Sequence, residues 1–193
     1  MHLKHLVFGA ILSVLLADPA HAQPRGIDGI PLTKVPRILI SVGQSGDARV
    51  PLVHAAVAHW NGLLAGMGSG FRLGPVSIGG GASGQSGAIV VVLSDAVFVS
   101  HATRLGGHGA VVMIRSANGP PLSLPNVARN VIAHEIGHAI GLGHNSDPTT
   151  LMCGRPAPCR PPLFASQTAR YFPLTASDRS RLLILYPPGW KGQ

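Results

Sequence analysis

The chain has 193 residues, enough for one domain with a sizeable core but short for two. Its 15 Lys and Arg exceed its 7 Asp and Glu, giving a formal net charge of +8. The arginines are spread thinly, without the dense basic run or interleaved aromatic patch that single-stranded nucleic acid requires, so nucleic-acid binding is not expected. The excess charge fits attraction to acidic partners and a simple solubility bias equally well.

The first 22 residues have the pattern of an export signal. A basic start at Lys4 precedes an apolar run from Leu6 to Leu16, and Ala20-His21-Ala22 has the form of an A-x-A cleavage site. We expect cleavage after Ala22, leaving an exported protein, secreted or periplasmic. An uncleaved N-terminal anchor is the alternative. No later segment is apolar and long enough to predict a membrane span.

Residues 23–36 contain Gly and Pro but little apolar periodicity, which predicts an extended arm, and residues 37–193 are predicted to form a single domain. A helix is expected from Pro51 to about Leu64, because Val53, Val57, Trp60 and Leu64 repeat at helical spacing. Short apolar or β-branched runs predict strands at residues 37–42, 71–76, 88–93 and 110–114, with a possible edge strand at 101–105.

A second helix is expected to begin near Asn126, a candidate N-cap, and to carry His134-Glu135-Ile-Gly-His138. Residues four apart project from the same helix face, so His134 and His138 would lie side by side. Gly141 can adopt positive φ, end the helix and turn the chain, which would bring His144 round as a third nitrogen ligand. Three histidines with an adjacent glutamate predict a catalytic zinc site with an open position for water.

The full pattern, HExxHxxGxxH from His134 to His144, resembles the long zinc-binding motif of the metzincin metalloproteases. The resemblance implies an α+β, zincin-like fold. Such a fold has a twisted mixed sheet of about five strands with one antiparallel edge strand, an active-site helix, a Met-turn and a C-terminal helix. It also implies that extended peptide substrates pair with the edge strand.

Two features after the motif resemble the matrixin branch of that family. Met152 stands where matrixins place the methionine of a tight turn beneath the zinc, as an apolar floor and not as a ligand. Thr175 and Asp178 predict a capping box for a final helix that ends before Pro187. Cys153 departs from the family, which often has tyrosine at this position.

The resemblance implies a zinc-dependent endopeptidase in which Glu135, the only glutamate of the chain, is the general base. One catalytic zinc is expected. Calcium is not expected, because Asp95 is the only acidic residue between Asp47 and Glu135 and calcium prefers several oxygen ligands. His101 and His108 are expected to be surface histidines, with a second zinc site as the alternative.

Cys153 and Cys159 are the only cysteines, and an oxidising compartment would favour a small disulfide loop between them. Free thiols, or a thiolate offered to zinc, are the alternatives. A monomer acting on peptide or protein substrates is expected. Two other functions stay open: a zinc hydrolase of non-peptide amides, and a non-catalytic exported binding protein with the same fold.

Overall fold

The computed structural model describes residues 29–79, 81, 83–119, 122–154 and 168–192. The predicted signal peptide at residues 1–22, the first part of the predicted arm and Cys159 lie outside these ranges. Within them, the helices and strands follow one another in this order: β1 Arg37–Val42, α1 Val50–Gly66, β2 Val76–Ile78, β3 Ala88–Leu93, β4 His101–Arg104, a 3₁₀ turn Gly106–His108, β5 Gly109–Ile114, α2 Pro125–Ala139 and α3 Ala176–Leu185.

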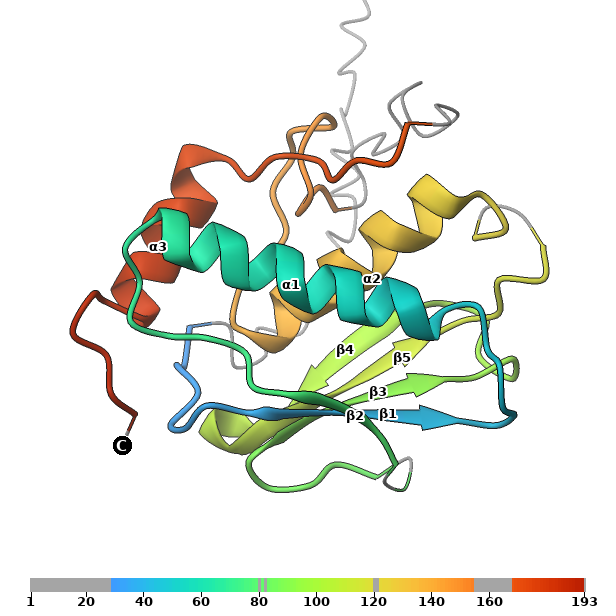
Figure 1. The fold of residues 1–193 in the computed structure, drawn as a ribbon. Coiled ribbons are helices and arrows are strands. Elements are labelled where there is room, and N and C mark those ends of the chain that lie inside the picture. Colours follow the sequence, from blue (N-terminus) through green and yellow to red (C-terminus); the bar gives the residue numbers. More distant parts are fainter. Residues whose placement is uncertain (1–28, 80, 82, 120–121, 155–167, 193) are drawn as a thin grey trace, which may run out of the picture.

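The described strands form a five-stranded sheet in the order β2-β1-β3-β5-β4 (Figure 1). β2, β1, β3 and β5 are parallel, whereas β4 pairs antiparallel with β5 and lies at one edge. The predicted mixed sheet with one antiparallel edge strand is therefore confirmed. The edge strand itself begins at His101 and ends at Arg104, close to the predicted segment.

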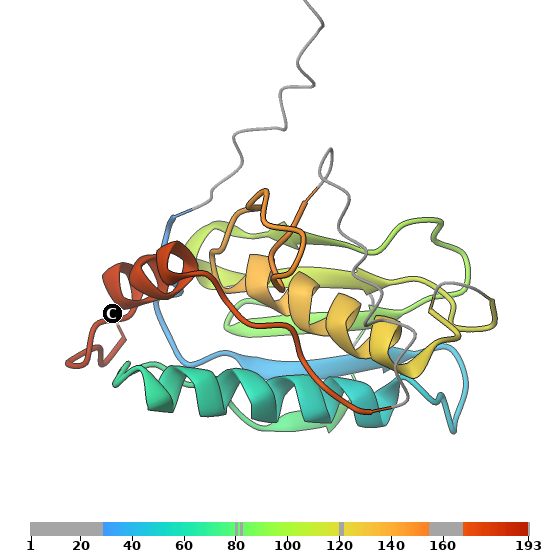
Figure 2. The ribbon, with the colours of Figure 1, turned by 90° about the horizontal axis from the view of Figure 1, so that it is seen from above.

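Helices α1 and α2 cover the same face of the sheet (Figures 1 and 2). The main core lies between them and the sheet, and its strand residues alternate along the chain, for example Ile38 and Ile40 in β1. Trp60 of α1 is fully buried there and donates its indole N–H to the Ala133 carbonyl of α2 at 2.9 Å. As expected, Trp60 is a core residue, and it ties the two helices together.

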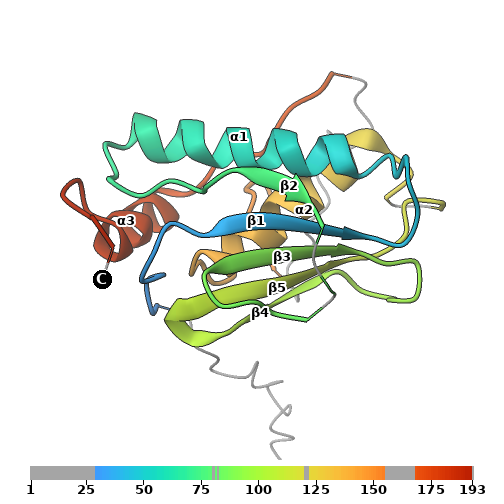
Figure 3. The same cartoon turned by 60° about the horizontal axis from the view of Figure 1, so that its bottom comes forward.

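The opposite face of the sheet, seen in Figure 3, carries a smaller apolar cluster that includes Val90 and Val92. All six residues of β3 are buried, as its continuous apolar run predicted. The segment around Gly84 helps to cover this face, because a Cβ at Gly84 would lie 2.3 Å from Leu105 and 3.2 Å from Val111. The glycine allows the chain to pass directly over the sheet.

Two predictions of local structure were wrong. Residues 71–75 form no strand, and β2 is limited to Val76–Ile78. Phe71 and Leu73 are buried as in a strand, but the Leu73 N–H donates to the Asn61 side chain at 2.8 Å, and Pro75 has no N–H to donate. Apolar alternation in this segment reflects burial against the core and not membership of the sheet.

Asn126 is not the N-cap of α2. The cap position lies two residues earlier, at Leu124, where no side chain caps the helix, and Pro125 lies in the first turn. The buried Asn126 side chain instead donates to the Thr168 carbonyl at 2.8 Å. Its polar group connects α2 to the segment that precedes α3.

The predicted C-terminal helix is confirmed. Thr175 accepts a hydrogen bond from the Asp178 N–H, and the Asp178 side chain accepts one from the Thr175 N–H, which together form the predicted capping box. The helix ends before Tyr186, whose buried ring stacks on Phe71. Among the described residues, no helix is both long and apolar enough to cross a bilayer.

Candidate metal centre

Three histidine side chains converge at the end of α2. The Nε2 atom of His138 lies 2.9 Å from that of His134 and 3.0 Å from that of His144, and the third Nε2–Nε2 distance is 3.2 Å. His134 and His138 are half-buried, whereas His144 is exposed. Within the described part of the chain, this is the one group of three or more such side chains that could hold a metal ion.

The end of α2 is built to bring His144 to the two helical histidines. Gly141 has φ +105°, and the N–H groups of Gly141 and Leu142 donate back to the His138 and Gly137 carbonyls, both at 3.0 Å. These bonds form a Schellman motif, which needs a residue that tolerates positive φ. The predicted role of Gly141 in ending the helix is therefore confirmed.

Backbone carbonyls orient two of the imidazoles. The Nδ1 atom of His134 lies 2.7 Å from the Leu151 carbonyl oxygen, and that of His138 lies 2.8 Å from the Leu142 carbonyl oxygen. A carbonyl only accepts, so each Nδ1 carries the proton and each Nε2 presents a lone pair to the centre. This is the tautomer that binds a metal through Nε2.

The donor set fits a zinc ion. Tetrahedral zinc with Zn–N distances of about 2.0–2.1 Å places its ligand nitrogens about 3.3 Å apart, close to the distances among the three Nε2 atoms. Burial, together with the neighbouring His138, lowers the pKa of His134 to about 3. His134 is therefore neutral at physiological pH, which is the protonation state that binds metal.

Glu135 lies on α2 directly after the first of these histidines and is buried, with 7% of its surface exposed. Burial raises the pKa of its carboxyl group to about 8. A raised pKa is typical of a carboxyl group that exchanges protons near neutral pH, although the charge of a bound cation would lower it.

Met152 lies beneath the helix that carries the histidines, and its side chain is fully buried. A Cβ at Gly137 would lie 2.6 Å from its sulfur, so the absence of a side chain at Gly137 allows Met152 to pack directly on α2. The Asn145 N–H donates to the Met152 carbonyl at 2.9 Å, closing the turn between His144 and Met152. Met152 therefore packs against the helix that carries His134 and His138, and its role as an apolar floor beneath a metal stays a prediction.

Two contacts that support His144 were not predicted. A Cβ at Gly154 would lie 2.1 Å from the imidazole Cγ of His144, so only glycine leaves room for this ring. The Asn145 side chain donates to Asp178 Oδ2 at 2.9 Å and thereby links the loop after His144 to the capping box of α3. Asn145 and Asp178 are 33 residues apart, so only the fold reveals that they meet.

Other predicted site residues lie elsewhere. His101, at the start of β4, and His108, in the 3₁₀ turn, are both exposed, as expected of surface histidines. Cys153 is buried beside the Met152 turn, but Cys159 lies outside the described residues, so their disulfide stays a prediction. The Arg104 side chain, from the end of β4, reaches the C-terminal end of α2, where its Nη1 would lie 3.4 Å from a Cβ at Gly141.

Comparison with known proteins agrees with this site. The model of the Matrixin family of peptidases matches residues 122–186, which include α2, the three histidines, the Met152 turn and α3. No curated protein matches the chain.

Two solved structures match this chain. Archaemetzincin from Methanopyrus kandleri matches with a TM-score of 0.50 at 14% identity, over 84% of this chain and 97% of its own. Metalloproteinase-II from Bacteroides fragilis matches with a TM-score of 0.49 at 16% identity, over 84% of this chain. This chain spans 59% of the length of the Bacteroides protein.

Proposed function

We propose that this chain, a matrixin-like member of the metzincin zinc metallopeptidases, is an exported endopeptidase that cleaves extended peptides with Glu135 as general base. The single observation that carries the proposal is the convergence of three Nε2 atoms, from His134, His138 and His144, at a helix that carries the buried Glu135 directly after His134. Metal carriage alone would need the histidines but not the glutamate.

His134, His138 and His144 would hold the zinc ion. Bound zinc supplies Lewis-acid chemistry, because it polarises a substrate carbonyl and makes water acidic near pH 7. The Glu135 carboxylate accepts the proton of the attacking water and then delivers it to the leaving amine. The Leu151 and Leu142 carbonyls hold two imidazoles in the ligating tautomer throughout.

The substrate would bind as an added strand along β4. Within the described sheet, β4 pairs on one side with β5, lies at one edge and contacts α2, the helix that carries two of the histidines. An edge strand presents backbone N–H and C=O groups that an extended peptide can pair with, largely independently of its side chains. This binding mode favours endopeptidase cleavage of unfolded or flexible protein segments.

Export is proposed from the sequence. The basic start, the apolar run and Ala20-His21-Ala22 predict a signal peptide, and the protein would then act outside the cytoplasm. Sequencing the N-terminus of the protein recovered outside the cell checks this step. A chain that starts at Gln23 is expected, whereas an intact N-terminus on a membrane-bound protein would contradict it.

The experiment that tests the activity measures zinc content and cleavage of a quenched peptide library by the purified protein. Glu135→Gln is expected to keep stoichiometric zinc and to lower cleavage by about 10²–10⁴-fold, the usual contribution of a general base. A chelator should abolish cleavage by the unmodified protein. His54→Gln, at an exposed histidine of α1, serves as the matched control and should retain both properties.

Two outcomes would contradict parts of this proposal. Zinc binding without cleavage of any peptide, but with hydrolysis of non-peptide amides, would indicate a different zinc hydrolase. Equal cleavage by the unmodified protein and Glu135→Gln would remove Glu135 from the mechanism.

A further inference from the structure

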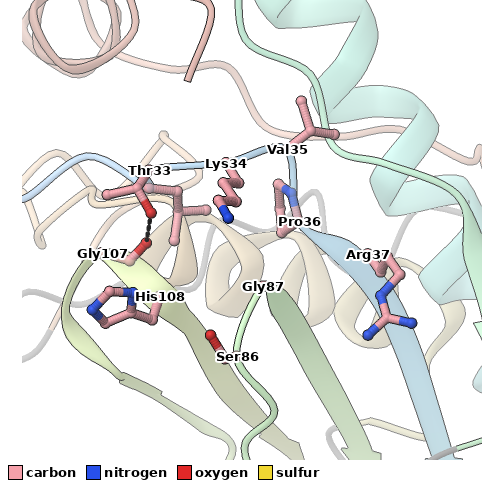
Figure 4. Close-up of a pocket in the computed structure, with 10 residues that line it drawn as sticks. Thr33, Lys34, Val35, Pro36, Arg37, Ser86, Gly87, Gly107 and His108 are labelled. Carbon is pink, nitrogen blue, oxygen red and sulfur yellow. Dashed lines mark hydrogen bonds between the residues drawn. The ribbon is translucent and has the colours of Figure 1, made fainter. Parts of the chain in front are cut away.

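A cavity of about 610 Å³ lies at the amino ends of the parallel strands β1 and β3 and at the turn before β5 (Figure 4). Three separate segments line it: residues 32–37 of the arm, residues 86–87 before β3, and residues 107–108 before β5. None of the three histidines or Glu135 lines this cavity, so the proposed hydrolysis leaves it without a role.

Backbone hydrogen bonds hold the three walls together. The Thr33 N–H and hydroxyl donate to the Gly107 carbonyl at 2.9 and 3.0 Å. The Arg37 N–H donates to the Gly87 carbonyl at 3.0 Å, and the Gly87 N–H donates to the His108 carbonyl at 2.6 Å. The cavity is therefore preformed, which lowers the entropic cost of binding a ligand.

Glycines allow the walls to approach so closely. A Cβ at Gly107 would lie 2.9 Å from Thr33 Cγ2 and 3.1 Å from the Pro31 carbonyl oxygen. Gly87 has φ +73°, a conformation that residues with side chains rarely adopt. The turn before β5 and the turn before β3 are thus shaped to close on the arm.

The side chains that line the cavity give it a positive charge. Lys34 and Arg37, both exposed, contribute two cations, His108 contributes an imidazole, and none of the described residues that line the cavity is an aspartate or glutamate. The ion pairs of the described residues all involve Arg49, so neither Lys34 nor Arg37 has a carboxylate partner there. Figure 4 shows Lys34 extending from the arm toward the turn at Gly87, between Thr33 and Pro36.

Concentrated charge without a counter-charge in a concave site attracts anions. A guanidinium group binds carboxylate or phosphate with two parallel hydrogen bonds, and an ammonium group adds a point charge. The lining also includes the apolar residues Leu32, Val35 and Pro36, of which Val35 is exposed and can contact a carbon skeleton. The volume lies in the range of small-molecule pockets and exceeds what a single inorganic anion fills.

We propose that this cavity is a binding site for a small organic anion with at least two carboxylate or phosphate groups. One group would pair with Arg37 and another with Lys34, while the apolar part of the ligand packs on the arm. The proposal does not depend on the proposed peptidase activity, because the cavity and the metal centre share no residue.

Titration of the full, isotope-labelled protein with citrate, followed by NMR, tests the proposal. We expect saturable shifts at the Thr33, Gly87 and Gly107 amides. The double variant Lys34→Ala/Arg37→Ala should weaken binding about tenfold or more, because it removes both charge-assisted hydrogen-bond donors. Arg170→Ala/Arg179→Ala, which removes the same charge from exposed positions outside the cavity, should keep the affinity within about twofold.

Inorganic phosphate as a second probe separates a built site from general attraction. Citrate should bind more tightly than phosphate, since it carries several charged groups on a carbon skeleton. Phosphate binding as tight as citrate, shifts that do not saturate, or equal weakening by both double variants would each overturn the proposal. If Lys34→Ala/Arg37→Ala fails to fold, Lys34→Gln alone tests the proposal. It should weaken citrate binding less than the double variant would, and unchanged citrate affinity would overturn the proposal.

Discussion

Two half-buried histidines of this protein have pKa values lowered by the same cause but differ in their chemistry. Burial lowers the pKa of His134 to about 3 and that of His59, on α1, to about 4. Both are therefore neutral at physiological pH. His134 has its Nδ1 on a backbone carbonyl and its Nε2 beside two other imidazoles, whereas His59 stacks on Tyr171 with ring centroids 3.9 Å apart.

The surroundings of His59 form a packing cluster. Its Nε2 and the Tyr171 hydroxyl are buried without a hydrogen-bond partner in the described structure, and the Arg129 guanidinium lies 5.6 Å from the Tyr171 ring centre. These side chains join α1, α2 and the segment before α3. The comparison shows that burial makes a histidine neutral, while convergence of lone pairs and oriented tautomers is needed for metal binding.

The largest expected difference between the two regions is in zinc content. His138→Ala should lose bound zinc. Removal of an outer hydrogen-bond partner of a ligand lowers metal affinity by roughly 10–100-fold, and removal of the ligand itself should lower it further. His59→Ala should keep one zinc per chain. Elemental analysis after dialysis measures both, and stoichiometric zinc in His138→Ala would contradict the ligand assignment.

Packing beneath the metal centre is expected to be sensitive to a single methyl group. In Gly137→Ala, the added Cβ would lie 2.6 Å from the Met152 sulfur and 3.0 Å from the Trp60 ring, so overpacking should cost about 1–3 kcal/mol. Gly62→Ala is the matched control on α1, where a Cβ meets nothing within 4 Å. It should stabilise the protein by about 0.5–1 kcal/mol.

Urea unfolding of both glycine variants measures these changes in the free energy of unfolding. If Gly137→Ala were as stable as Gly62→Ala, the close packing of Met152 on α2 would not be a feature of the folded protein.

His59 should make stability depend on pH. Its folded pKa of about 4 lies below its ordinary value of 6.5, so the unfolded chain binds a proton first as the pH falls. The contribution is complete above pH 6.5 and is lost progressively down to about pH 4. Allowing for partial solvent screening, the loss should be about 1–2 kcal/mol.

His59→Phe keeps a ring to stack on Tyr171 but cannot be protonated. Its free energy of unfolding should therefore fall less than that of the unmodified protein between pH 6.5 and 4. If the free energy of unfolding fell in parallel with pH for both proteins, His59 would be protonated equally easily in the folded and unfolded chains.

The smallest expected effect concerns the link between His144 and α3. Asp178→Ala removes the acceptor of the Asn145 and Thr175 hydrogen bonds, and should cost about 1 kcal/mol of stability. It should also weaken zinc binding by up to about tenfold, because the loop that carries His144 loses its anchor. Ser180→Ala, at an exposed position of the same helix, is the control.

A competition titration with a zinc-binding dye measures this affinity. Unchanged zinc binding in Asp178→Ala, together with lower stability, would limit Asp178 to capping α3 and would separate the metal centre from that helix.

The local parts of the site could be predicted from the sequence because they depend on residues close together in the chain. Helical spacing places His134 and His138 on one face, positive φ at Gly141 turns the chain, and Thr175 with Asp178 caps α3. The buried strand β3 was predicted from its continuous apolar run for the same reason.

The failures arose where distant residues decide the outcome. Asn126 has the side chain of an N-cap, but the Thr168 carbonyl, 42 residues away, takes its hydrogen bond. Residues 71–75 alternate like a strand, but the side chain of Asn61 binds the Leu73 N–H. Local propensity was overridden by tertiary contacts in both places.

By itself, then, the sequence determined which side chains could bind zinc, since ligand identity and helical spacing are written in adjacent residues. Only the tertiary structure decided how they are held. The Leu151 carbonyl behind His134, the burial that raises the pKa of Glu135 and the cavity around Lys34 and Arg37 all need segments far apart in the chain. The folded core brings those segments together, and no local pattern predicts such contacts.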